Sequence, residues 1–281
     1  MWNEFAALKE LDRERFAKDI TLPPAKIRYV MYFTPRSGSS WITDMAEGTR
    51  QLSIPGECFN PNFLSTMTRA LNANTMEEYT AILERRRNTK DIYGFQITYH
   101  QLKKVFDNDD TFITLFPVAN WHSFWLIRED IVLQAVSLFK MVKTQIAHTP
   151  QTSVSDIAAQ DRTLKYDGPE IKRWLEHILA AERGTEALFE REDITPFRMS
   201  YERNTAVNSH GVIDTMCRHL GVHRPRLSQP ESSHKKIGTS INDQYADRFR
   251  AENVDFLRQV DRDRERTLAL LEDYNTSEMR A

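Results

Sequence analysis

Cysteine is scarce in this sequence, and repeats and linkers are absent. Cys58 and Cys217 are the only cysteines among 281 residues, too few for a disulfide framework or a cysteine-built zinc site. We therefore expect two free thiols. The chain has no fixed-period repeat, no low-complexity tract and no Gly/Ser linker. These absences exclude a solenoid or a string of modules and predict a single domain over residues 1–281.

Long apolar runs and an excess of charge are lacking as well. No window approaches the roughly 18 apolar residues of a membrane-spanning helix, and residues 1–20 carry charges where a secretory signal would be apolar. We expect a cytoplasmic protein without an integral membrane segment. The formal net charge is −2, from 38 Lys and Arg against 40 Asp and Glu, so nucleic acid is not an expected partner. Any anion site must be local.

Apolar runs and helical patterns alternate along the chain. Short apolar runs predict strands at 27–33, 92–98, 112–118 and 123–127, and a further strand is expected at 197–201, between two predicted helices. Amphipathic patterns predict helices at 39–50, 74–88, 130–147, 169–191 and 204–220, and residues 242–273 fit one long charged helix or two shorter ones. This alternation predicts an α/β fold with a mostly parallel central sheet covered by helices on both faces.

The segment YFTPRSGSSWITDM, residues 32–45, gathers one arginine and several hydroxyls around a single glycine. A predicted strand precedes it and a predicted helix follows, so backbone N–H groups and the positive end of the helix dipole converge there. Arg36 adds a bidentate positive charge, and Ser37, Ser39 and Ser40 add neutral donors. The pattern predicts a phosphate or sulfate site; the alternative is an ordinary serine-rich helix cap.

The sequence lacks the familiar motifs for ATP binding and for metal binding. The ATP-binding pattern GxxxxGK[ST] needs a lysine after its second glycine, whereas Ser39 follows Gly38. The chain also lacks HExxH, a Cys/His cluster and a paired aspartate triad, so no metal is expected. A standard kinase P-loop is therefore disfavoured.

A second candidate anion site lies where another predicted strand meets its helix. In FWLIREDIVLQAVSLFKMVKTQ, Arg128 stands at the strand end and Ser137 about two turns into the helix, so both could face one crevice. Alternatively, Arg128 pairs with Glu129 or Asp130 and Ser137 is only a small helix residue. Two such strand ends in one sheet favour the binding interpretation.

With these motifs the sequence resembles the PAPS-dependent sulfotransferases, whose donor is 3′-phosphoadenosine 5′-phosphosulfate (PAPS). TPRSGSSW is similar to the family's 5′-phosphosulfate loop, and Arg128 and Ser137 are similar to its 3′-phosphate ligands. QAVS at 134–137 and PGECF at 55–59 resemble the bacterial carbohydrate branch of trehalose 2-sulfotransferase and the nodulation-factor and lipopolysaccharide sulfotransferases. WLEHILAAE, ITPFRMSYERN and HKKIGTSINDQYADRFR extend the likeness to about residues 28–253. It implies a P-loop-like sulfotransferase fold with a charged helical C-terminal tail.

The resemblance implies a role for each motif residue. The nucleotide, PAPS or its product 3′-phosphoadenosine 5′-phosphate, would contact Pro35, Arg36, Ser37, Gly38, Ser39, Ser40, Trp41, Arg128 and Ser137. Lys235 and Lys236 lie where sulfotransferases close over the nucleotide, or else form a solvated basic pair. Core packing is the alternative role for Trp41.

The implied reaction moves a sulfuryl group in line from a phosphate to a hydroxyl, through a charge-dispersed transition state like that of phosphoryl transfer. Arg36 would stabilise the leaving phosphate and the sulfuryl oxygens. By the resemblance of PGECF, Glu57 would be the base that accepts the hydroxyl proton. The alternatives are a solvated Glu57 and a base among His100, His122 and His148. No metal is implied.

The sequence thus predicts a sulfotransferase that uses PAPS and a hydroxyl acceptor on a carbohydrate or glycoconjugate. The acceptor would be a small molecule or a glycolipid, and a homodimer is possible. Gln96 stands where the branch often has lysine, and residues 150–167 have no counterpart. Two other functions stay open: a nucleotide-binding module without transfer activity, and a nucleotide or small-molecule kinase.

Overall fold

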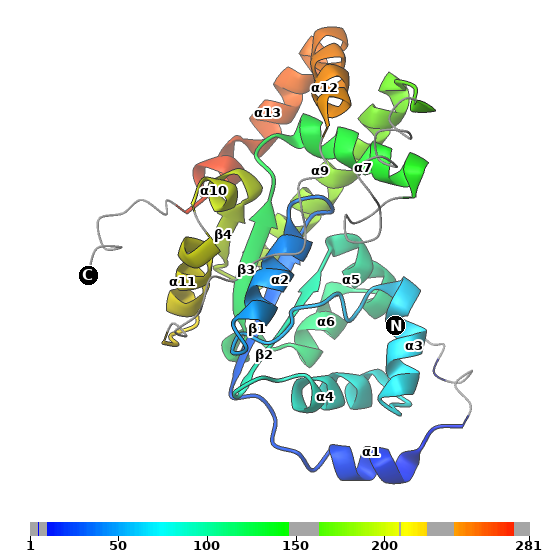
Figure 1. The fold of residues 1–281 in the computed structure, drawn as a ribbon, viewed down its shortest axis with the longest axis vertical. Coiled ribbons are helices and arrows are strands. Elements are labelled where there is room, and N and C mark those ends of the chain that lie inside the picture. The colour runs from blue at the N-terminus through cyan, green and yellow to red at the C-terminus, as the bar shows by residue number, and fades with distance from the viewer. Residues whose placement is uncertain (1–4, 6–9, 146–162, 208, 224–238, 273–281) are drawn as a thin grey trace.

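A four-stranded sheet forms the centre of the protein (Figure 1). The computed structural model describes residues 5, 10–145, 163–207, 209–223 and 239–272. The strands are β1 (Ile27–Phe33), β2 (Ile92–Ile97), β3 (His122–Ile127) and β4 (Phe197–Ser200), in the order β2-β1-β3-β4. Every neighbouring pair is parallel. The prediction of an α/β fold with a parallel sheet is therefore confirmed.

The register of the sheet brings distant segments to one edge. Phe33 pairs with Leu126, and Ile127 pairs with Ser200. The carboxyl ends of β1, β3 and β4 consequently lie side by side, and the segments that follow them start from the same edge. In parallel α/β sheets this edge is where ligands bind.

Helices follow each strand, and side chains mark where most of them begin. Thr98 forms a capping box with Gln101 at the start of α5 (Tyr99–Phe106), and Asp130 accepts from the Leu133 N–H at the start of α7 (Ile131–Thr144). Ser200 caps α10 (Tyr201–Ala206) in the same way. These caps satisfy N–H groups that a helix leaves without partners.

Further helices surround the sheet (Figure 1). They are α1 (Arg13–Asp19), α2 (Ser39–Gly48), α3 (Pro61–Ala70), α4 (Met76–Arg86), α6 (Asp109–Leu115), α9 (Gly168–Arg191), α11 (Ser209–His219), α12 (Ser240–Glu252) and α13 (Val254–Ala269), with a 3-10 helix η2 at Val118–Asn120. The charged tail is thus two helices. The predicted helix 204–220 is also divided, between α10 and α11.

The predicted strand at 112–118 is wrong, because this segment belongs to α6 and η2. Asn108 accepts from the Thr111 N–H and so caps the helix, and Asp109 and Asp110 fill its first turn. Carboxylates are favourable at that end of the helix dipole. The apolar residues of FITLF therefore form one face of a helix.

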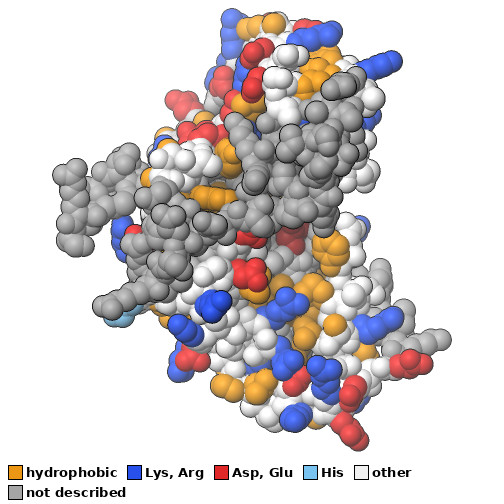
Figure 2. All heavy atoms as spheres, in the orientation of Figure 1, with side chains coloured by type: hydrophobic (Ala, Val, Ile, Leu, Met, Phe, Trp, Pro, Cys, Tyr) orange, Lys and Arg blue, Asp and Glu red, His pale blue; other side chains and the backbone are white. Residues whose placement is uncertain are grey.

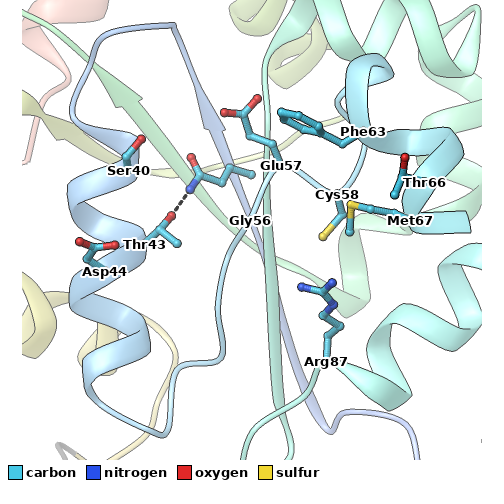
Figure 3. A pocket seen from close by; sticks show the side chains of 11 residues that line it. Ser40, Thr43, Asp44, Gly56, Glu57, Cys58, Phe63, Thr66, Met67 and Arg87 are labelled. Atoms are coloured by element: carbon cyan, nitrogen blue, oxygen red, sulfur yellow. Dashed lines mark hydrogen bonds between the residues drawn. The ribbon is translucent and has the colours of Figure 1, made fainter. Parts of the chain in front are cut away.

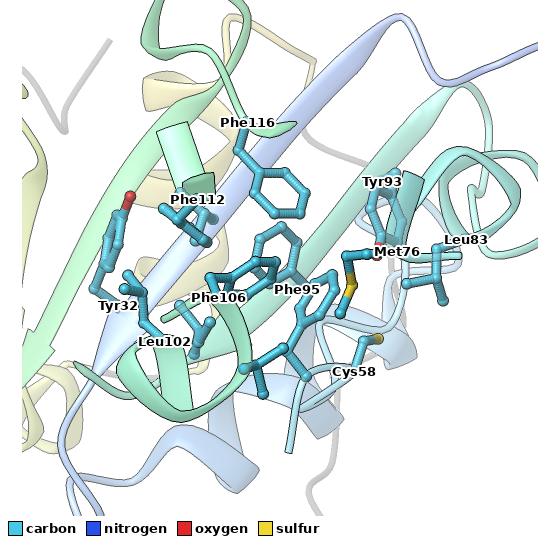
Figure 4. Packing of buried hydrophobic residues seen from close by; sticks show 14 of the residues in the cluster. Tyr32, Cys58, Met76, Leu83, Tyr93, Phe95, Leu102, Phe106, Phe112 and Phe116 are labelled. Carbon is cyan, nitrogen blue, oxygen red and sulfur yellow. The ribbon is translucent and has the colours of Figure 1, made fainter. Parts of the chain in front are cut away.

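The core lies on both faces of the sheet. Along β1, Val30 and Tyr32 pack into one cluster, while Tyr29, Met31 and Phe33 pack into another. Successive strand residues point to opposite faces, so burial of all five shows that both faces are covered. The first cluster includes side chains of α3 to α6 and is dominated by aromatic rings (Figure 4). The second includes α2 and α11.

Candidate active site

The loop between β1 and α2, residues 34–38, is fixed by hydrogen bonds from within and from α7. Ser37 is fully buried, and both its N–H and its hydroxyl donate to the Thr34 carbonyl, at 3.3 and 2.7 Å. The Gln134 amide of α7 donates to the Thr34 hydroxyl at 2.8 Å and to the Pro35 carbonyl at 2.7 Å. The turn therefore holds its shape through its own contacts, and the donors of Ser37 serve the turn.

Gly38 begins α2 with a left-handed backbone, φ +87°. A Cβ at this position would stand 2.7 Å from Cδ2 of Tyr201. No side chain in the described part of the chain caps α2, in contrast to α5, α7 and α10. The first N–H groups of α2 are thus presented at the carboxyl edge of the sheet, as an anion site requires.

Gly38→Ala should displace this loop. The variant combines left-handed strain, about 1–2 kcal/mol for an L residue, with the contact against Tyr201. We expect a lower free energy of unfolding in denaturant titration and weaker nucleotide binding in calorimetry. The matched control is Gly221→Ala, which has φ +66° and nothing within 4 Å of the new Cβ. If both variants bind nucleotide equally well, the close approach of Tyr201 to the loop has no role in binding.

Arg36 joins the two anion sites that the sequence predicted separately. Its Nε donates to the Ser137 hydroxyl of α7 at 3.1 Å. Its backbone is left-handed, with φ +68°. Burial lowers the pKa of Arg36, and the nearby charge of Arg128 lowers it further. Two arginines close enough to repel each other form a site that an anion would stabilise.

Arg128 is held by residues of the segment that follows β4. Its Nε donates to Glu202 at 3.3 Å, and its guanidinium carbon lies 4.8 Å from the centre of the Tyr201 ring. Glu202 also accepts from the Glu129 N–H at 2.7 Å. The alternative pairing of Arg128 with Glu129 or Asp130 is not found, because these carboxylates pair with Arg203 and Arg250.

Glu57 lies in a loop that its neighbours hold in place. Phe59 is fully buried, and its ring packs against Phe95 at 4.9 Å between centroids. Two amides donate to the same carboxylate oxygen, Oε2 of Glu57: Gln101 at 2.6 Å and Asn60 at 2.8 Å. Both hydrogen bonds that described residues give to this carboxylate thus go to Oε2, which leaves Oε1 to a ligand.

The amide of Gln101 cannot turn round without losing a bond. Its Oε1 accepts from the Thr98 N–H at 3.0 Å within the capping box of α5. A backbone N–H can only donate, so the oxygen must face Thr98 and the NH₂ group must face Glu57. The start of α5 thereby orients the carboxylate.

A cavity of about 560 Å³ separates α2 from α3 (Figure 3). Pockets of roughly 300–1,000 Å³ are typical of small-molecule sites. The lining residues are Ser40, Thr43, Asp44, Gly56, Glu57, Cys58, Phe63, Thr66, Met67, Arg87 and Gln96. Figure 2 shows hydrophobic, basic and acidic side chains side by side on the face that carries α2, α3 and α4. The cavity therefore offers apolar walls with several polar groups.

Gln96 ties the Glu57 loop to α2. Its amide nitrogen donates to the Pro55 carbonyl at 2.6 Å and to the Thr43 hydroxyl, and its N–H donates to the Gly56 carbonyl at 3.1 Å. In the sequence, Gln96 was notable only because the sulfotransferases it resembles often have a lysine at this position. The structure gives it a bridging role at the wall of the cavity.

Other predicted site residues lie apart or outside the described chain. Trp41 packs against the core cluster of α2 and α11, in agreement with its alternative role. His122 begins β3, roughly 16 Å along the strand from its carboxyl end. It therefore lies at the amino edge of the sheet, opposite the edge that carries the loop of Arg36. His100 stacks on His177 at 3.9 Å. Lys235, Lys236 and His148 lie outside the described residues.

Comparisons with known proteins extend these observations. Residues 28–252 match the model of a protein family described as Stf0 sulphotransferase, and no curated protein matches the chain. The match begins in β1 and ends in α12, so it includes every loop and cavity residue described above. In the part of the chain that the structure describes, no helix could cross a membrane, and no cluster of His, Cys, Asp and Glu could hold a metal.

Proposed function

The chain belongs to the Stf0 sulphotransferase family, and we propose that it transfers a sulfuryl group from PAPS to a hydroxyl of a carbohydrate or glycoconjugate. Family membership supports sulfotransferase activity in general. One observation carries the finer proposal: Ser40, in the first turn of α2, and Glu57 line the same cavity. An acceptor in this cavity would stand between an anion cradle and a carboxylate.

The donor would bind at the carboxyl edge of the sheet. The N–H groups of α2 and the guanidinium of Arg36 would hold the 5′-phosphosulfate, and Arg128 with Ser137 would hold the 3′-phosphate. The contact between Arg36 and Ser137 supports this assignment, because it makes the two anion sites continuous. A doubly anionic nucleotide would also relieve the repulsion between the two arginines.

In the transfer step, the acceptor hydroxyl would lose its proton to Oε1 of Glu57 as its oxygen forms a bond to sulfur. The bond between sulfur and the phosphate oxygen breaks, and the electron pair leaves with 3′-phosphoadenosine 5′-phosphate. Arg36 and the α2 amides would stabilise the charge on the sulfuryl oxygens and the leaving phosphate. The hydrogen bonds from Gln101 and Asn60 would keep the carboxylate aimed at the acceptor.

The direct test is transfer of labelled sulfate from PAPS to a panel of sugars, glycolipids and small alcohols. We expect sulfated product from PAPS and no phosphorylated product from labelled ATP. Tight binding of 3′-phosphoadenosine 5′-phosphate without transfer to any acceptor would favour the non-catalytic module instead. Phosphoryl transfer from ATP would favour the kinase.

A second prediction concerns nucleotide selectivity. 3′-Phosphoadenosine 5′-phosphate should bind about ten- to a hundredfold more tightly than AMP, because a paired phosphate adds charge-assisted hydrogen bonds worth about 1.5–3 kcal/mol. Arg128→Ala should remove most of this difference while AMP affinity stays nearly constant. Calorimetry with both nucleotides measures the effect. Equal affinity of the wild-type protein for the two ligands would refute the 3′-phosphate assignment.

A further inference from the structure

We propose that the acceptor carries an anionic group, a carboxylate or a phosphate ester, which binds Arg87 while the reacting hydroxyl faces Glu57. This inference rests on the proposed function and deepens it by naming the class of acceptor. Its starting observation is a basic side chain in the wall of the cavity, across from the carboxylate of Glu57 (Figure 3).

The backbone of Arg87 is anchored on both sides. The residue ends α4 as its C-cap, and its N–H donates to the Leu83 carbonyl at 2.8 Å. Its carbonyl accepts from the Ser53 hydroxyl at 2.7 Å. The backbone is thus fixed, and the exposed side chain of Arg87 lines the cavity from this point (Figure 3).

Arg87 differs from the two arginines that precede it. Arg85 pairs with Glu84 at 3.1 Å, and Arg86 pairs with Asp19 of α1 at 3.4 Å. Among the described residues, no such carboxylate pairs with Arg87. Burial raises the pKa of the Cys58 thiol, and the charge of Arg87 opposes that shift. The positive charge thus lies close to a residue of the cavity wall.

The acidic and the basic side chains of the cavity lie on different sides of it. Asp44 of α2 and Glu57 lie on one side, and Arg87 lies on the other, beside Cys58 and Met67 (Figure 3). An acceptor with an anionic group would be repelled from the acidic side and attracted to Arg87. Its other end, with a hydroxyl, would then reach Glu57 and the first turn of α2. One charge would fix the direction in which the acceptor enters.

The wall between these charges is suited to an apolar face. Phe63 of α3 lines the cavity and is 56% exposed, and Met67 lies one turn further along the same helix. The C–H face of a sugar ring or a short alkyl chain can pack against such side chains. A sugar acid or sugar phosphate glycoside combines the anionic group, the apolar face and the free hydroxyl.

The test uses three matched acceptors: hexyl β-glucoside, hexyl β-glucuronide and hexyl β-glucoside 6-phosphate. With PAPS as donor, at least one anionic acceptor should show a kcat/KM about ten- to a hundredfold above the neutral one, as expected for a charge-assisted pair. The better of the two identifies the anion. Arg87→Gln should abolish this preference, because it should lower kcat/KM for the anionic acceptors about ten- to a hundredfold more than for the neutral one. Arg86→Gln, the neighbouring control, should change neither the preference for anionic acceptors nor the kcat/KM of the neutral acceptor.

Calorimetry on the complex with 3′-phosphoadenosine 5′-phosphate separates this inference from the proposed function. The same ligands should show the same order of affinity and the same dependence on Arg87, whether or not sulfate is transferred. The inference is overturned if the neutral glycoside binds as well as both anionic ones. It is also overturned if Arg87→Gln weakens all three equally, since Arg87 would then only shape the cavity.

Discussion

Glu57→Gln should lower turnover by about two to four orders of magnitude, the usual contribution of a general base. The glutamine keeps the shape of the side chain, and its oxygen can accept the hydrogen bonds that Gln101 and Asn60 give to Oε2. It cannot accept a proton from the acceptor hydroxyl. Affinity for 3′-phosphoadenosine 5′-phosphate should hardly change, because in the proposed complex the carboxylate would face the acceptor. Steady-state kinetics and calorimetry measure the two quantities separately.

Two further variants sharpen this test. Glu77→Gln removes an exposed carboxylate from the first turn of α4 and should leave turnover unchanged. Gln101→Glu keeps the oxygen that Thr98 needs, but places a second carboxylate against Glu57. Two close carboxylates share a proton at low pH, so the acidic limb of the pH–rate profile should move to higher pH. Near-normal turnover of Glu57→Gln would exclude Glu57 as the base, and His100 would be tested next.

β4, with the sequence FRMS and two buried residues, was predicted from its place between two helices. β1, β2 and β3 were predictable because most of their residues are buried. They read as short apolar runs, as in YVMYF and SFWLI, since parallel strands between helical layers have no solvent side. The same signal failed at 112–118, where the apolar run belongs to α6. The cap at Asn108 and the acidic first turn were visible in NDDTFITLF. A capped start with carboxylates in the first turn indicates a helix more strongly than a short apolar run indicates a strand.

The candidate site was predictable only in its local parts. The loop around Arg36 and the PGECF segment can each be recognised from their local residue composition. The partners of these residues come from elsewhere: Ser137 from α7, Tyr201 and Glu202 from the start of α10, and Gln101 from α5. The capping box TYHQ was readable in the sequence, but nothing local indicates that its glutamine also reaches Glu57. Such contacts depend on how segments that are distant in the sequence pack against one another in the fold.

Arg36 allows function to be separated from stability at a single position. Arg36→Ala removes the guanidinium and keeps the left-handed backbone of an L residue, φ +68°. Arg36→Gly removes the same group and relieves that strain, which is worth about 1–2 kcal/mol. A greater loss of chain entropy on folding offsets roughly 0.4–1 kcal/mol of this gain. The free energy of unfolding of the glycine variant should therefore lie within about 1 kcal/mol of the wild-type value.

Both variants should lose transfer activity by about two to three orders of magnitude, the effect of removing one donor that stabilises transition-state charge. Donor affinity should fall as well, because in the proposed complex Arg36 would also contact the ground-state nucleotide. Denaturant titration gives the stability, and single-turnover transfer from PAPS gives the rate. Equal losses in a strained and an unstrained variant would locate the effect in the guanidinium. Wild-type rates in the glycine variant alone would instead show that the backbone conformation of the loop, and not the charge of Arg36, promotes transfer.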